Sequence, residues 1–151
     1  MKRISKHISY KEAVGSNYAK QHGIKNKPND EQVENMKLLA EKVFEPLREW
    51  VGCPIKVNSM FRSLELNTAL KGSKTSSHMK GEAMDITRMA CDKENCKSNL
   101  DMFHWIKDNL EFDQLIWEFG STPKWLHVSY NKDKNRKQVL VTKKRGVYYT
   151  Y

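Results

Sequence analysis

The sequence has no long hydrophobic run and few cysteines. Its longest apolar runs, such as Leu115-Ile116-Trp117, are three residues, whereas a membrane helix needs roughly 20, so no membrane span is expected. Cys53, Cys91 and Cys96 cannot all pair within one chain. The first ten residues carry positive charge but are followed by no apolar core, so we expect no signal peptide. Without export to an oxidising compartment, free thiols are expected.

Linkers and repeats are also missing. The chain has only 7 glycines and 4 prolines, and it contains no internal repeat or low-complexity tract. The content of 38% hydrophobic and 30% charged residues is typical of globular proteins. Residues 1–151 are therefore expected to form one domain.

Acidic residues are outnumbered by basic ones. The chain has 27 Lys and Arg against 18 Asp and Glu, a net charge of +9. This excess favours a polyanionic partner, which includes nucleic acid, anionic lipid and acidic cell-wall polymers. No helix-turn-helix, zinc-finger or RNA-binding motif accompanies the charge, so specific nucleic-acid binding is not expected.

Hydrophobic periodicity predicts an α+β fold. Apolar residues at helical spacing follow a cap at Asn29 or Asp30 and continue to Gly52. Pro46 lies inside this helix and predicts a kink or an early stop there. Further helices are expected at residues 11–20, 64–70 and 98–110. Strands are expected at residues 55–59, 81–86, 112–119, 125–130, 138–142 and 147–151. The predicted fold is a small, mostly antiparallel sheet with helices packed on it.

Three side chains have metal-ligand character: His78, Asp85 and His127. His78 ends a serine-rich loop, whereas Asp85 and His127 lie in predicted strands. Alternation places each strand side chain on a definite face, and the two converge if those faces meet. Two imidazoles and one carboxylate leave a fourth tetrahedral position for water, as in catalytic zinc sites. On spacing alone, a hydrogen-bonded core histidine is the commoner explanation.

Three longer segments carry more specific patterns. Residues 76–86 (SSHMKGEAMDI) resemble the S-x-H-x-x-G-x-A-x-D signature of the zinc D,D-peptidases that cut peptidoglycan peptides. Residues 59–67 (SMFRSLELN) are similar to the S-G-Y-R-S-x-x-L-N segment of that family, and residues 125–129 (WLHVS) resemble its W-x-H-V-S strand. Residues 5–9 and 44–48 resemble its small phage-type branch. The resemblance implies the Hedgehog/DD-peptidase fold.

The resemblance also implies a set of site residues. It assigns His78, Asp85 and His127 as ligands of Zn²⁺, with water in the open position. Arg62 matches an arginine that stabilises the oxyanion or holds a substrate carboxylate, and Ser76 matches a serine that contacts substrate. The alternatives are an arginine in a surface salt bridge and a turn-capping hydroxyl.

The general base is less well defined. Many relatives carry Asp or Glu three residues before the last histidine ligand, but Lys124 occupies that position here and cannot act as a base while charged. Glu118 on the neighbouring strand is the candidate, with Asp113 as the second choice. Since the sequence does not fix the strand register, a solvated surface glutamate is the alternative for Glu118.

The expected activity is zinc-dependent hydrolysis of an amide bond in peptidoglycan stem peptides or cross-links. Both D,D-carboxypeptidase and endopeptidase chemistry fit. The expected setting is a phage lysin that is in the host cytoplasm before release to the cell wall, or a virion component in contact with other virion proteins. The alternative is a non-catalytic cell-wall-binding or virion structural module that keeps the fold, which Lys124 favours.

Overall fold

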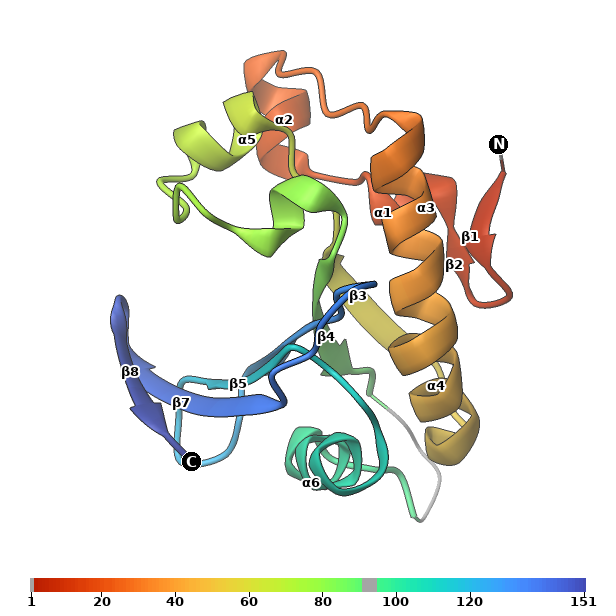
Figure 1. Ribbon diagram of the computed structural model, residues 1–151, viewed down its shortest axis with the longest axis vertical. Coiled ribbons are helices and arrows are strands. Elements are labelled where there is room, and N and C mark those ends of the chain that lie inside the picture. Colours follow the sequence, from red (N-terminus) through yellow and green to blue (C-terminus); the bar gives the residue numbers. More distant parts are fainter. Residues whose placement is uncertain (1, 91–94) are drawn as a thin grey trace.

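Helices and strands combine in the α+β arrangement that the periodicity predicts (Figure 1). The structure is a computed structural model that describes residues 2–90 and 95–151. The elements of the first half are β1 (Arg3–Ser5), β2 (Ile8–Ser9), α1 (Tyr10–Ala13), α2 (Asn17–His22), α3 (Asp30–Leu39), the π-helical η1 (Ala40–Phe44), α4 (Glu45–Val51), β3 (Ile55–Ser59) and α5 (Leu64–Ala69). Those of the second half are the 3₁₀ helix η2 (Ser77–Lys80), β4 (Ala83–Arg88), α6 (Asn99–Asn109), β5 (Gln114–Glu118), β6 (Trp125–Ser129), β7 (Gln138–Lys144) and β8 (Val147–Thr150).

In the described part of the chain, six strands form one sheet in the order β3-β4-β6-β5-β7-β8. The β5–β6 and β7–β8 pairs are antiparallel, as predicted. The β5–β7 pair is parallel, because the chain returns beside β5 after residues 130–137. The sequence pattern did not predict this pair, nor the small β1–β2 hairpin.

Alternation along the central strands separates the hydrophobic core from the opposite face of the sheet. Met84 and Ile86 of β4 and Leu126 and Val128 of β6 are fully buried. Helix α6 packs against β5 and β6, and Figure 1 shows it on the opposite side of the sheet from α5 and η2. Asp85 lies between the apolar positions of β4, and His127 lies between those of β6. Both side chains therefore face the side of the sheet on which η2 and α5 lie.

The predicted long helix extends from Asp30 to Val51, with a change of winding in its middle. Asn29 caps it, since its side chain accepts from the Gln32 N–H at 2.8 Å, and it ends at Gly52 in the left-handed conformation. The π-helical turn η1 ends two residues before Pro46, which has no N–H to donate. The helix therefore accommodates the proline without the early stop that was one of the two expectations.

Two expectations about the rest of the chain are wrong. Residues 11–20 do not form one helix, because Ser16 caps a new helix, α2, with its side chain accepting from Ala19 N–H at 3.1 Å. Cys96 is disulfide-bonded, which contradicts the expectation of a free thiol at this residue; Cys91 lies outside the described residues. None of the helices in the described ranges has the length and apolar character needed to cross a bilayer.

Candidate metal centre

Strands β4 and β6 bring Asp85 and His127 side by side. The two residues are direct partners in the antiparallel register, on the face of the sheet opposite to the buried Met84 and Val128. The His127 Nδ1 lies 3.0 Å from the Asp85 Oδ1. The convergence expected from strand alternation is therefore present.

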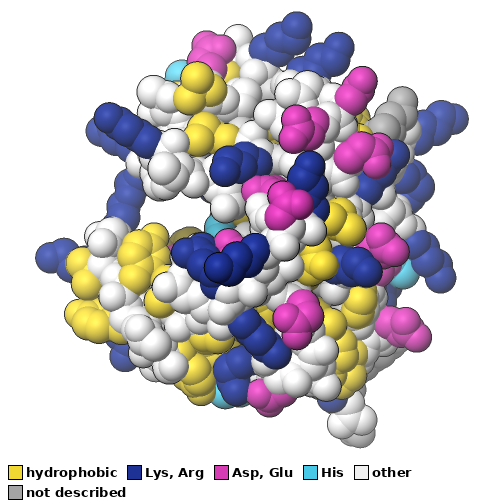
Figure 2. All heavy atoms as spheres, viewed as in Figure 1, with side chains coloured by type: hydrophobic (Ala, Val, Ile, Leu, Met, Phe, Trp, Pro, Cys, Tyr) yellow, Lys and Arg dark blue, Asp and Glu magenta, His cyan; other side chains and the backbone are white. Residues whose placement is uncertain are grey.

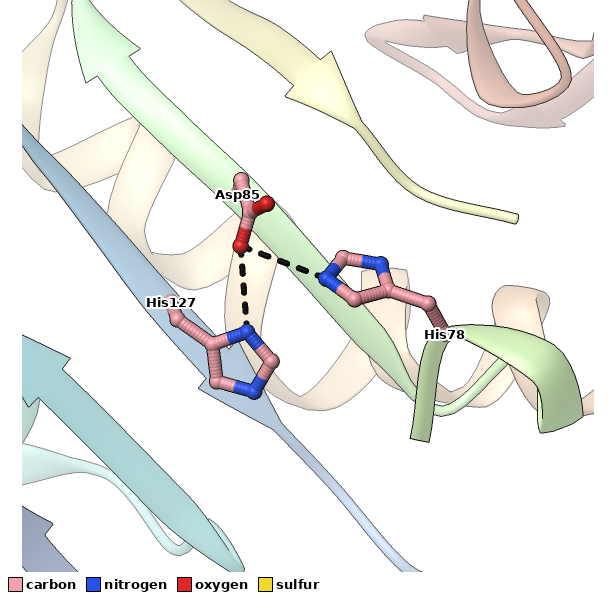
Figure 3. Close-up of side chains that lie close together, drawn as sticks. All are labelled: His78, Asp85 and His127. Carbon is pink, nitrogen blue, oxygen red and sulfur yellow. Dashed lines mark hydrogen bonds and ion pairs between the residues drawn. The ribbon is translucent and has the colours of Figure 1, made fainter. Parts of the chain in front are cut away.

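His78 approaches the same carboxylate oxygen from η2 (Figure 3). Its Nε2 lies 3.3 Å from the Asp85 Oδ1, and its Nδ1 is hydrogen-bonded to the Met60 carbonyl at 2.7 Å. His78 as a whole is only 3% exposed. The Met60 carbonyl thus fixes the ring so that its other nitrogen points at the carboxylate, as backbone carbonyls do for metal-bound histidines.

The geometry and chemistry of this group suit a zinc ion. One donor atom from each of His78, Asp85 and His127 lies within 4.8 Å of the other two. Zinc binds imidazole nitrogen and carboxylate oxygen at about 2.0 to 2.2 Å, and catalytic sites use three protein ligands with a fourth position open. Within residues 2–90 and 95–151, this is the one group of His, Cys, Asp and Glu side chains close enough to hold a metal ion.

The carboxylate of Asp85 is kept ionised by its neighbours. Burial alone would raise its pKa, but the charge of His78 and the hydrogen bonds from both histidines outweigh this effect and hold the pKa well below its usual range. A metal ligand has to be deprotonated. Asp85 is therefore in the charge state that metal binding requires.

Arg62 lies beside the same carboxylate. Its Nη2 is 3.4 Å from the Asp85 Oδ2, its side chain is 20% exposed, and its Nε donates to the Ser59 Oγ at 3.2 Å. The backbone N–H of Arg62 also donates to the His78 carbonyl at 3.2 Å. Arg62 is thus built into the site, unlike the surface arginine that was the alternative.

Sequence reasoning missed Asn26, which organises the chain around Arg62. Its Nδ2 donates to the Phe61 carbonyl at 3.0 Å, and its Oδ1 accepts from the Ser63 N–H at 2.7 Å. Asn26 therefore holds both neighbours of Arg62 in place. In the sequence it lies in a stretch that indicates only a turn, and no local signal points to this contact across 35 and 37 positions.

Strand β5 places Glu118 on the face that carries the metal group. Ile116 is the register partner of His127 and Glu118 that of Trp125, so Glu118 and His127 share a face. Burial, and then the charge of Asp85, raise the pKa of Glu118 to about 7, although the charge of His127 acts in the opposite direction. Glu118 is thus within electrostatic reach of the metal group, and it is not the fully solvated glutamate of the alternative.

The other two residues considered for the base lie elsewhere. Asp113 precedes β5, at the opposite end from Glu118, and Arg136 donates to both its carboxylate oxygens at 2.9 and 3.0 Å. The hydrogen bonds and charge of Arg136 lower the pKa of Asp113 although burial opposes them. Lys124 is exposed in the turn before β6. Neither residue is placed as a base for this site.

Ser76 caps η2. Its Oγ accepts from the His78 N–H at 3.3 Å, which is the turn-capping role that was the alternative for this residue. The hydroxyl proton is still available for donation. A contact between Ser76 and substrate stays a prediction.

Gly81 fits η2 against the long helix. Its φ is +74°, and a Cβ atom would lie 2.4 Å from the Gln32 carbonyl oxygen. The Gln32 side chain in turn donates to the Met79 carbonyl at 2.9 Å. Helix α3 therefore supports the turn that carries His78, and Gly81 permits the close approach.

We expect Gly81→Ala to lower the free energy of unfolding by about 3 kcal/mol, from about 1 to 2 kcal/mol of left-handed backbone strain and the rest from the clash. Gly52→Ala is the matched control, because Gly52 has φ +72° but nothing within 4 Å of its Cβ position. The Gly52→Ala variant should lose only the free energy that corresponds to the left-handed backbone strain, about 1 to 2 kcal/mol. Equal losses for the two variants in urea unfolding would refute the role of the Gln32 contact.

The raised pKa of Glu118 predicts a pH-dependent stability of the metal-free protein. The folded protein holds a proton at Glu118 up to pH about 7, whereas the ordinary pKa of a glutamate side chain is 4.5. Between these values the folded state binds more protons than the unfolded chain, so this contribution to the free energy of unfolding is present below pH 4.5 and is lost as pH rises through 7.

Glu118→Gln has no carboxylate to titrate, so the variant does not lose this stability as the pH rises. With chelator present, we expect the variant to be more stable than the wild type by about 1 to 2 kcal/mol at pH 8 and equal to it at pH 4.5. Thermal unfolding at both pH values measures this, and a difference that does not change with pH would contradict it.

Comparison with known protein families gives a match over most of the chain. A model of the peptidase M15 family matches residues 6–129. Comparison with curated proteins gives no match. The matched range contains all three residues of the metal group together with Arg62 and Glu118, and it ends where β6 ends. The chain therefore belongs to the peptidase M15 family, a family of zinc peptidases, and its α+β fold is consistent with that membership.

Proposed function

We propose that the protein is a zinc-dependent peptidase that hydrolyses an amide bond in the stem peptides or cross-links of bacterial peptidoglycan. The observation that carries this proposal is the convergence of His78, Asp85 and His127 on one spot, with Glu118 on the same face of the sheet. Family membership supports metallopeptidase chemistry. The peptidoglycan substrate comes from the motif resemblance.

In this proposal, His78, Asp85 and His127 hold the metal. A bound zinc ion lowers the pKa of water to about 7 and polarises the scissile carbonyl. Glu118 accepts the proton of the attacking water and passes it to the leaving amine. A carboxylate whose pKa lies near neutrality can both take up and release a proton at the working pH, and in the metal-free protein the burial of Glu118 raises its pKa in this direction.

Arg62 and Ser76 are proposed to bind the substrate. The guanidinium of Arg62 is fixed by Ser59 and Asp85, which orients it for the carbonyl oxygen that gains charge or for a substrate carboxylate. The Ser76 hydroxyl accepts from the His78 N–H and has its own proton free to donate to a peptide carbonyl.

The test is mass spectrometry of purified muropeptides incubated with the zinc-loaded protein. We expect hydrolysis that a chelator abolishes and added zinc restores. Loss of a terminal D-alanine would identify a carboxypeptidase, and conversion of cross-linked dimers into monomers would identify an endopeptidase. Unchanged muropeptides after incubation with the zinc-loaded protein would refute the proposal.

Lys124 favours a second candidate, a non-catalytic module that binds the cell wall. It occupies the position where many relatives carry an acid, and it is exposed. Such a module would sediment with insoluble peptidoglycan but leave muropeptide masses unchanged. The phage-lysin setting is a further proposal from the motif resemblance, and it predicts that added protein lowers the turbidity of bacteria with permeabilised envelopes.

A further inference from the structure

The β7–β8 hairpin lies beyond the range that the family model matches, and its tip contacts the segment that follows α5. The match ends at residue 129, whereas the hairpin spans residues 138–150. At its tip, the Arg145 Nη2 donates to the carbonyl oxygens of Leu70 at 3.3 Å and Lys71 at 3.2 Å. These carbonyls lie just after α5. The hairpin tip is therefore joined to the segment between α5 and η2.

This contact bridges a hollow in the molecular surface. Figure 1 shows the tip of β7 and β8 rising toward α5 on the side of the sheet opposite α6. Figure 2 shows a hollow on this side with histidine and acidic side chains in its floor and basic side chains at its edges. Exposed basic residues on the two joined segments are Lys71, Lys74, Lys143, Lys144 and Arg145. Such an edge suits a peptide that carries carboxylates.

The strand register places Tyr148 on the face of the metal group. Tyr148 is the partner of Thr142 in β7, and Thr142 is the partner of Glu118 in β5. Paired residues share a face, so Tyr148 stands two strands, or about 10 Å, from Glu118. The side chain between them is the small and buried Thr142. Tyr148 and the candidate base therefore lie on the same face of the sheet, on either side of Thr142.

The surroundings of Tyr148 support the same placement. The residue is 51% exposed, so it is accessible to a ligand. Partial burial, and then the negative charges of Glu118 and Asp85, raise its pKa. The phenol consequently stays protonated and can donate a hydrogen bond.

We propose that Tyr148 is a substrate-binding residue, whose hydroxyl donates to a carboxylate or carbonyl oxygen of a peptide lying in the hollow beside the hairpin (Figure 2). Arg145 is a positioning residue that holds the hairpin against the α5–η2 segment through the Leu70 and Lys71 carbonyls. This inference rests on the proposed peptidase function and extends it, because the binding surface includes a hairpin beyond the matched range.

The direct test is Tyr148→Phe, which removes only the hydroxyl. Tyr149→Phe is the matched control, since Tyr149 is 60% exposed but pairs with Val141 and points to the opposite face. We expect Tyr148→Phe to raise the KM for a muropeptide about tenfold, as loss of one hydrogen bond to a charged or carbonyl oxygen does. kcat, zinc content and thermal stability should stay unchanged. Equal KM values for the two variants would overturn the inference.

Arg145→Ala tests the positioning role. We expect a KM increase similar to that of Tyr148→Phe, together with faster amide hydrogen exchange in residues 138–150, which Tyr148→Phe should not show. Arg145→Lys keeps a donor for the carbonyls and should restore part of the affinity. Faster exchange without any change in KM would refute the link between the hairpin and substrate binding.

A binding measurement separates this inference from the proposed function. The dissociation constant of a muropeptide from zinc-loaded Glu118→Gln protein should increase about tenfold when Tyr148→Phe is added. A wild-type protein that binds the muropeptide without cleaving it refutes the peptidase proposal, and the binding comparison still decides the role of Tyr148. Equal dissociation constants, or no binding at all, would overturn the inference.

Discussion

Asp85→Asn is expected to abolish stoichiometric zinc binding and, with it, peptidase activity. Asparagine has nearly the same shape but carries no charge, and the lost oxygen can be the one that both His78 and His127 approach, at 3.3 and 3.0 Å. Loss of a residue that merely orients a ligand already weakens metal binding 10- to 100-fold, so we expect zinc affinity to fall by more than about 100-fold. Zinc analysis after dialysis and muropeptide turnover measure the two effects.

The control for this substitution is Asp108→Asn. Asp108 is an exposed residue of α6 whose carboxylate contacts Lys107, far in the fold from the metal group because α6 covers the other face of the sheet (Figure 1). It should retain zinc and activity. Circular dichroism shows whether each variant is folded. A folded Asp85→Asn protein that keeps one tightly bound zinc ion would show that Asp85 is not a ligand.

Glu118→Gln is expected to lower kcat by about 100- to 10,000-fold, the usual contribution of a general acid–base group, while one zinc ion stays bound. Glutamine has nearly the same volume but cannot accept the proton of the attacking water. Because Glu118 is not one of the three grouped ligands, its loss should separate catalysis from metal binding. Steady-state turnover combined with zinc analysis tests this expectation.

Glu111→Gln is a suitable comparison for Glu118→Gln. The side chain of Glu111 is 72% exposed, and its carboxylate forms only a loose ion pair with Lys137, at 3.8 Å. This variant should match the wild type in both measurements. A Glu118→Gln protein as active as Glu111→Gln would show that Glu118 is not the general base and that another group accepts the proton.

The metal group shows how far sequence reasoning can go. Alternation along a strand specifies the face of Asp85 and of His127 once the strands are recognised, and the antiparallel pairing of β4 and β6 then brings them together. The place of His78 could not be derived in this way. It depends on η2, whose position is set by contacts of Met79 and Gly81 with Gln32 of α3, almost fifty positions earlier, and only the motif resemblance pointed to it.

Glu118 and the β7–β8 hairpin show where local patterns are insufficient. A register slip of one residue would have moved Glu118 to the opposite face, and the sequence contains nothing that fixes this register. The parallel pairing of β5 with β7 and the contact of Arg145 with the Leu70 carbonyl, 75 positions away, depend on the assembled sheet. Those features determine what surrounds the metal group, so the surroundings of the site were less predictable than its centre.

X-ray diffraction from crystals of the zinc-loaded protein, recorded at the zinc absorption edge, addresses the metal centre most directly. We expect one anomalous peak within about 2.0 to 2.2 Å of the His78 Nε2, a carboxylate oxygen of Asp85 and a ring nitrogen of His127. An anomalous map without a peak among these three side chains, with the imidazoles still hydrogen-bonded to Asp85, would contradict the assignment.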